Sequence, residues 1–159
     1  MYKTNNTLSH NIRTASIELL QERLFDGCDL MTQTKQAHWN VKGPNFIALH
    51  ELFDRIHSQV DGYVDLIAER IVALGGQANG TVRSAAEFSS LPEYPLGSQE
   101  QVDHVESLSN ALAVFGDKIR HAIDVAADMD DQNSSDIFTE ISRGIDKSLW
   151  FVEAHNQQN

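Results

Sequence analysis

Residues 46–74 carry apolar side chains at steps of three or four residues with almost no interruption. This spacing is the period of an α-helix that buries one face. Gly43-Pro44 before the stretch and Gly75-Gly76 after it are typical of a helix start and a helix stop. A helix over residues 45–74 would be about 45 Å long, so other long helices must pack against it. Its apolar stripe is Phe46, Leu49, Phe53, Ile56, Val60, Tyr63, Ile67, Ile71 and Leu74.

The same period predicts three further long helices: one from about Ile17 to Trp39, one after Ser98, and one over Ile137 to Val152. The third helix follows Ser98-Gln99-Glu100-Gln101, which has the S-x-x-Q form of a capping box. Between residues 77 and 97 the periodicity is weak, which predicts an irregular connection with a short helix near residues 84–88. We therefore expect an all-α, ferritin-like four-helix bundle with a long crossover between the second and third helices that carries a short helix.

A chain of 159 residues with 41% hydrophobic content can bury one sizeable core. We expect a single domain over residues 1–159, with a flexible N-terminal tail at 1–11 and a polar C-terminal tail at 155–159. The lone cysteine, Cys28, cannot form an internal disulfide, and we interpret it as a small buried hydrophobe. The N-terminus lacks the apolar core of a secretory signal, and no charge-free run could span a bilayer. These features predict a soluble, cytoplasmic protein.

The chain has 23 acidic and 12 basic residues and a net charge of −11, a balance that attracts cations and opposes polyanions. Its basic residues are scattered, and the first dozen or so residues offer only Lys3 and Arg13. Binding to nucleic-acid phosphates requires clustered positive charge. We expect weak or no direct DNA binding.

Histidine and carboxylate side chains share one side of the second predicted helix. His50 and Asp54 are four residues apart, as are Asp65 and Glu69. The eleven steps from Asp54 to Asp65 return to within about 20° of the same direction but cover about 16 Å, so one helix cannot close a shared metal site. Two copies packed antiparallel across a two-fold axis would bring the two halves together, as an isologous interface requires. His38 could complete each of the two equivalent sites.

Two imidazoles and three carboxylates without a thiolate suit iron, manganese or zinc. The alternative is that these are solvated face residues together with a satisfied histidine. No Glu-x-x-His motif occurs in the chain, which disfavours a di-iron centre built inside a single bundle.

Three stretches resemble Dps proteins, the mini-ferritins named as DNA-binding proteins from starved cells. They are KQAHWNVKGPNFIALHELFD, DLIAERIVALGG and IDKSLWFVE, and the likeness covers the chain beyond about residue 12. The resemblance implies a hollow dodecameric shell built from two-fold dimers. It also implies di-iron ferroxidase sites at the subunit interfaces, with ferrous iron and hydrogen peroxide as substrates and iron storage that limits oxidative damage. Positions that match the ligands of one subunit are His38, His50 and Asp54, and those that match the neighbouring subunit's are Asp65 and Glu69.

We also predict roles for residues outside this ligand set. Trp39 matches the family tryptophan beside the site, where it could trap a stray oxidising equivalent, and the alternative is a core or interface residue. In Dps-like shells the region around the acidic cluster Asp128, Asp130, Asp131 and Asp136 lies near three-fold pores, which suggests a funnel for ferrous ions. Carboxylates at a helix N-terminus are the simpler explanation for Asp136. Of the remaining histidines, we expect His57 in interface packing and His104 and His121 on the surface.

Two other functions stay open from the sequence. One is a nucleoid-associated structural protein that protects DNA by coating it. The other is an oligomer that binds zinc or manganese without redox turnover.

Overall fold

A computed structural model of the protein describes residues 1–98 and 100–157. This part of the chain contains five helices and no β-strand. The helices are α1 (His10–Asn40), α2 (Phe46–Ala73), α3 (Val82–Phe88), α4 (Gln101–Asp128) and α5 (Gln132–Glu153).

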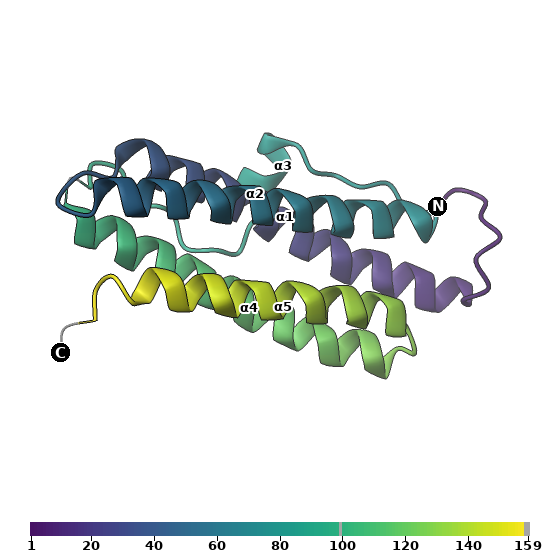
Figure 1. Cartoon of the computed structure of the whole chain (residues 1–159). Coiled ribbons are helices and arrows are strands. Elements are labelled where there is room, and N and C mark those ends of the chain that lie inside the picture. Colours follow the sequence, from purple (N-terminus) through teal and green to yellow (C-terminus); the bar gives the residue numbers. More distant parts are fainter. Residues whose placement is uncertain (99, 158–159) are drawn as a thin grey trace.

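The four long helices form two closely packed pairs, α1 with α2 and α4 with α5 (Figure 1). Contacts of α1 with α4 and of α2 with α5 join the pairs into one bundle. The connection between α2 and α4 runs along the bundle, and its short helix α3 packs against α1 (Figure 1). The prediction of an all-α, ferritin-like bundle with a helix in the long crossover is confirmed.

The interior is one contiguous apolar cluster to which all four long helices contribute, among them Leu24, Phe53, Phe115 and Phe138. Cys28 belongs to this cluster, as expected, and burial raises the pKa of its thiol. Within the described residues, no helix is both long enough and apolar enough to cross a bilayer.

The first helix begins earlier than its apolar stripe suggested. Ser9 caps it, and the Ser9 side chain accepts a hydrogen bond from the backbone N–H of Ile12 (3.2 Å). Residues 10 and 11, predicted as the end of the tail, therefore lie in α1. Ahead of the cap, the backbone N–H of Tyr2 donates to the carbonyl of Gly75 (2.6 Å), which places the start of the chain against the end of α2.

The predicted capping box is wrong. The helix α4 begins at Gln101 with Glu100 as its N-cap, and among the described residues no side chain makes a capping hydrogen bond there. Ser98 instead donates its hydroxyl to the carbonyl of Pro95 (3.2 Å), and Gln99 lies outside the described residues. The Gln101 side chain accepts from the backbone N–H of Asn45 (3.1 Å), so it joins the α1–α2 loop to α4 and does not cap its own helix.

Polar side chains of α1 hold the crossover in place. The fully buried Asp26 carboxylate accepts hydrogen bonds from the backbone N–H (2.8 Å) and hydroxyl (2.7 Å) of Ser90. Asp29 accepts from the Ser89 hydroxyl (2.6 Å), and the Gln33 amide donates to the carbonyl of Pro92 (2.9 Å). Because buried polar groups need partners, these contacts fix an irregular segment that has no apolar periodicity.

A second buried polar contact closes the turn between α4 and α5. Asp131 caps α5 and accepts hydrogen bonds from the backbone N–H (3.2 Å) and hydroxyl (2.6 Å) of Ser134. The Arg70 guanidinium at the end of α2 donates to the same carboxylate (2.6 Å). Asp130, immediately before the cap, has a positive φ of 60°, which lets the chain reverse in a short turn.

Candidate metal centre

His38 and His50 form a reciprocal pair where the end of α1 meets the start of α2. The His38 Nδ1 lies 2.8 Å from the carbonyl oxygen of His50, and the His50 Nδ1 lies 2.9 Å from the carbonyl oxygen of His38. The rings stack with their centroids 3.7 Å apart. The α1–α2 loop is short enough to bring the two backbones together, and both side chains are half-buried.

The partners of these two rings determine which nitrogen can bind a metal. A carbonyl oxygen only accepts hydrogen bonds, so each Nδ1 must carry the proton. In the neutral imidazoles the lone pairs are then on the two Nε2 atoms, and neutral imidazole is a common metal ligand. A backbone carbonyl on the other ring nitrogen is also the usual way in which proteins orient a histidine ligand. The structure thus brings together the two imidazole donors that the sequence predicted.

Asp54 lies one helical turn after His50 on α2 and is half-buried. Its carboxylate forms an ion pair with the ammonium of Lys35 on α1. The hydrogen bond from Lys35 holds the pKa of Asp54 below its usual value, and His38 and His57 add to the effect. Asp54 is therefore an anionic oxygen donor, but Lys35 already occupies the place beside it that a cation would take.

Asp65 and Glu69 are exposed on α2 and lie away from the histidine pair. Among the described residues of this single chain, no three His, Cys, Asp or Glu side chains are close enough to hold one ion. His38, His50 and Asp54 are at one end of α2, and Asp65 and Glu69 are toward the other. Whether a second subunit joins them stays a prediction.

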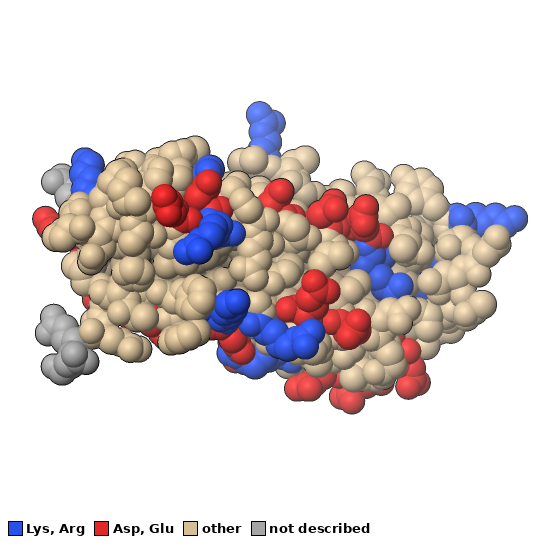
Figure 2. All heavy atoms as spheres, in the orientation of Figure 1, with Lys and Arg blue, Asp and Glu red and all other residues tan. Residues whose placement is uncertain are grey.

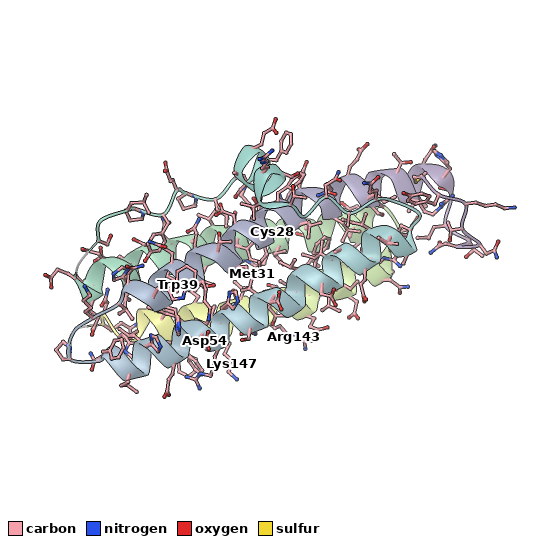
Figure 3. All side chains as sticks on the ribbon, turned by 90° about the horizontal axis from the view of Figure 1, so that it is seen from above. Cys28, Met31, Trp39, Asp54, Arg143 and Lys147 are labelled. Carbon is pink, nitrogen blue, oxygen red and sulfur yellow. The ribbon has the colours of Figure 1, made fainter. Side chains whose placement is uncertain are left out.

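Trp39 follows His38 and is exposed, with 67% of its surface accessible. Figure 3 shows it on α1 toward the same end of the bundle as Asp54 on α2, whereas Cys28 and Met31 lie nearer the middle. Trp39, Lys35 and His57 line an open cavity of about 730 Å³ together with Tyr94 of the crossover. The His57 Nδ1 lies 3.0 Å from the carbonyl oxygen of Met31, so a contact within the subunit orients this ring.

The acidic cluster divides into one structural residue and three exposed ones. Asp131 is buried and bound to Arg70 and Ser134, so it cannot also line a pore. Burial alone would raise the pKa of its carboxyl, but the hydrogen bonds from Ser134 and the charge of Arg70 hold it below its usual value. Asp128, Asp130 and Asp136 are exposed, and their place near a pore stays a prediction.

One histidine is not where the sequence placed it. His104 was expected on the surface but is only 1% exposed, and its Nδ1 is 2.6 Å from the hydroxyl of Tyr94. Tyr94 lies in the crossover, which has no helical pattern that could have shown this contact in advance. His121 is exposed, as predicted. The sequence also gave no sign of the Lys35–Asp54 pair, because side chains nineteen residues apart meet only when α1 and α2 pack together.

The chain is similar to known proteins over almost its whole length. Residues 17–158 match the profile of the ferritin-like domain family. The chain is 44% identical over 157 residues to the "DNA protection during starvation protein" of Agrobacterium fabrum, covering 99% of this chain and 97% of the relative. It is 32% identical to the protein of that name from Brevibacillus brevis, covering 86% and 91% of the two chains.

The fold of the chain is similar to that of solved Dps structures. A tetragonal crystal form of Mycobacterium smegmatis Dps superposes with a TM-score of 0.93 at 31% identity, covering 98% of this chain and 95% of the other. Dps of Microbacterium arborescens, in a high iron form, superposes with a TM-score of 0.89 at 35% identity, covering 96% and 99%. The similarity therefore spans the bundle and both halves of the candidate site.

Proposed function

The chain belongs to the Dps family of ferritin-like proteins, and on that premise we propose that it oxidises ferrous iron and stores the ferric product. The preferred oxidant is hydrogen peroxide, and the store is the inside of a hollow shell of twelve subunits. The observation that carries the proposal is the His38–His50 pair, whose Nδ1 contacts leave two Nε2 lone pairs as donors. The reaction removes iron and peroxide together and so limits oxidative damage.

Each site is shared by two subunits. One subunit supplies His38, His50 and Asp54, and its two-fold neighbour supplies Asp65 and Glu69. The exposure of Asp65 and Glu69 supports this arrangement, since carboxylates that serve a neighbour must be accessible on the single chain. Two antiparallel α2 helices then give two equivalent sites, each with two imidazoles and three carboxylates.

The ligand types explain why the site favours oxidation. Hard carboxylate oxygens stabilise ferric iron more than ferrous iron, so binding lowers the free energy of the oxidised product. Lys35 leaves Asp54 when iron arrives, because a dication competes with a single ammonium for the same carboxylate. Two ferrous ions, one hydrogen peroxide and two protons give two ferric ions and two waters, a balance that releases no hydroxyl radical.

Exposed apolar side chains support assembly into a larger particle. Trp39, Ile47, Val82, Leu96 and Trp150 are each more than 60% exposed in the single chain. An assembly that removed these side chains from water would gain free energy from their burial. The exposed Asp128, Asp130 and Asp136 could line the path by which ferrous ions reach the inside, since clustered carboxylates raise the local concentration of cations.

Direct DNA binding is weak or absent in this proposal. On the face shown in Figure 2, acidic side chains are interleaved with basic ones, and no continuous basic band crosses it. The net charge of −11 opposes a polyanion, and DNA affinity depends on the number of phosphates neutralised. Protection would then come from iron and peroxide chemistry and not from coating DNA.

A double variant tests the site. Asp54→Ala with Glu69→Ala removes one proposed carboxylate from each side of the interface and should abolish peroxide-driven formation of ferric iron. Glu51→Ala with Glu153→Ala removes two exposed carboxylates outside the ligand set and should leave the rate unchanged. Normal oxidation by the first variant would contradict the proposal. Retention of zinc or manganese by the wild type, with no ferric product, would support the redox-inactive alternative.

A further inference from the structure

Tyr94 and His104 form a buried pair that the proposed iron site does not use. Tyr94 lies in the crossover and is 8% exposed, and His104 on α4 is 1% exposed. The Tyr94 hydroxyl lies 2.6 Å from the His104 Nδ1, and the two rings are nearly parallel. This separation is at the short end of the range over which a proton passes directly between two side chains.

The surroundings define the protonation states of the pair. Burial raises the pKa of Tyr94 to about 12, so the phenol keeps its proton at neutral pH. Burial also lowers the pKa of His104, and of the nearby charges Asp103 opposes this shift while Lys42 adds to it. The imidazole is therefore neutral, and its Nδ1 is the acceptor for the phenol proton. Among the described residues, the His104 Nε2 has no hydrogen-bond partner, so Tyr94 is the contact that orients the ring.

A phenol bound to a neutral base is easier to oxidise by one electron than a phenol alone. Loss of an electron makes the phenol strongly acidic, and a base already in place takes the proton in the same step. The product is a neutral tyrosyl radical beside an imidazolium. An anchor for the crossover alone would need only a hydrogen bond, which an amide could supply as well as an imidazole.

Tyr94 lines a cavity beside the proposed iron site. Tyr94 lines the same cavity as Trp39, which follows His38, and Lys35, which holds Asp54. The proposed reaction creates a need for an electron donor here. When only one ferrous ion is bound, it reduces hydrogen peroxide by one electron and leaves an oxidant of hydroxyl-radical strength.

Resting on the proposed function, we infer that Tyr94 is a redox-active tyrosine with His104 as its proton acceptor. It holds one oxidising equivalent until a second ferrous ion arrives. In the first step an electron passes from Tyr94 to the hydroxyl-radical-level oxidant, giving hydroxide, and the phenol proton moves to the His104 Nδ1. In the second step a ferrous ion returns an electron to the tyrosyl radical, the proton returns from Nδ1, and ferric iron is formed. The sum remains two ferrous ions for each peroxide.

Electron paramagnetic resonance tests the pair in two arms. In the first, iron-free protein is oxidised by a photogenerated ruthenium(III) polypyridyl complex. In the second, protein with less than one ferrous ion per site receives hydrogen peroxide. Both arms should give a tyrosyl signal that Tyr94→Phe abolishes. Tyr63→Phe is the matched control, because Tyr63 is also a buried residue, but its hydroxyl accepts a hydrogen bond from the Gln59 amide (2.6 Å), which is not a base. This variant should keep the signal.

His104→Gln separates proton transfer from anchoring. The amide can accept the phenol hydrogen bond but cannot take the proton, so the signal should be lost while helix content and assembly size stay unchanged. Should Tyr94→Phe not fold, ring-deuterated tyrosine, which narrows the signal, together with the loss in His104→Gln identifies the radical.

The two arms show whether the inference about Tyr94 or the proposed function has failed. Absence of a Tyr94 signal in the ruthenium arm overturns the inference whether or not iron is oxidised. A signal there, with ferric iron formed by peroxide but no radical in the second arm, overturns the link to iron. If peroxide forms no ferric iron at all, the proposed function has failed, and with it the role of Tyr94 in that reaction.

Discussion

The ammonium of Lys35 on α1 is paired with the carboxylate of Asp54 on α2, one helical turn after His50. A single positive charge thus lies against an oxygen donor of the proposed site. Binding of a ferrous ion must displace that charge.

Replacing Lys35 with methionine removes the competitor and keeps much of the apolar stem. We expect ferrous iron to bind severalfold more tightly, because Asp54 no longer has to leave an ion pair. The pKa of Asp54 should also rise toward its usual value, since the Lys35 hydrogen bond is the main cause of its depression. Anaerobic titration with ferrous iron measures the change, and Lys42→Met, at an exposed lysine in the nearby loop, is the control. Weaker binding in Lys35→Met would mean that Lys35 supports the site.

Replacing His50 with alanine removes one of the two Nε2 donors. The backbone carbonyl of residue 50 remains, so the His38 Nδ1 keeps its partner and its orientation. We expect metal affinity to fall by about tenfold or more, since even an outer partner of a ligand is worth that much. Cobalt(II), titrated under anaerobic conditions, gives a spectroscopic readout. His121→Ala at an exposed position should bind normally, and equal affinities in the two variants would rule out His50 as a ligand.

Replacing Asp131 with asparagine leaves the Arg70 guanidinium without its anion. Breaking a buried pair by removing one partner costs about 3 kcal/mol or more, so the unfolding midpoint should fall at pH 7. The pKa of Asp131 is depressed in the folded protein, so its stabilisation is present above the unfolded value of about 3.9 and is lost as the pH falls through the folded value. The unfolding midpoints of Asp131→Asn and the wild type should therefore converge below about pH 4.

Thermal unfolding at a fixed protein concentration makes this comparison. Asp136→Asn, an exposed change in the first turns of α5, should change the free energy of unfolding by about 0.5 kcal/mol or less and so barely move the midpoint. Equal midpoints for Asp131→Asn and the wild type at pH 7 would show that the pair does not stabilise the turn.

Gly144 on α5 lets α2 approach closely. A Cβ there would lie 1.7 Å from the Tyr63 hydroxyl and 2.5 Å from the Gln59 amide nitrogen. Gly144→Ala should therefore destabilise the bundle by about 1–3 kcal/mol, the usual cost of overpacking. Gly62→Ala, where a Cβ meets nothing within 4 Å, should instead stabilise α2 by up to about 1 kcal/mol. An unchanged free energy of unfolding for Gly144→Ala in chemical denaturation would show that the close approach of α2 and α5 does not require glycine.

The elements that the sequence predicted are those with a strong local signal. The apolar stripe from Phe46 to Leu74 identified α2 almost to the residue, because a helix that buries one face repeats its pattern. His50 and Asp54 were recognised as neighbours for the same reason. The start of α1 was placed too late because its first turn carries no stripe, only the Ser9 cap.

The features that the sequence did not predict depend on contacts between distant segments. The capping box failed because the Ser98 hydroxyl bonds to Pro95 and the Gln101 side chain bonds to Asn45. His104 was placed on the surface because its partner, Tyr94, comes from an irregular connection. Lys35 was overlooked because it meets Asp54 only after α1 and α2 have packed. Asp131 was grouped with exposed acids, although its pairing with Arg70 joins residues 61 positions apart.

Gel filtration after iron oxidation tests the central claim most directly. Purified protein receives ferrous iron and then hydrogen peroxide, and the eluate is assayed for protein and ferric iron. Ferric iron should co-elute with a particle near the size of twelve subunits, with about one peroxide consumed for every two irons. Iron that precipitates outside a small oligomer would contradict the account and leave the histidine and carboxylate set to structure or to another metal.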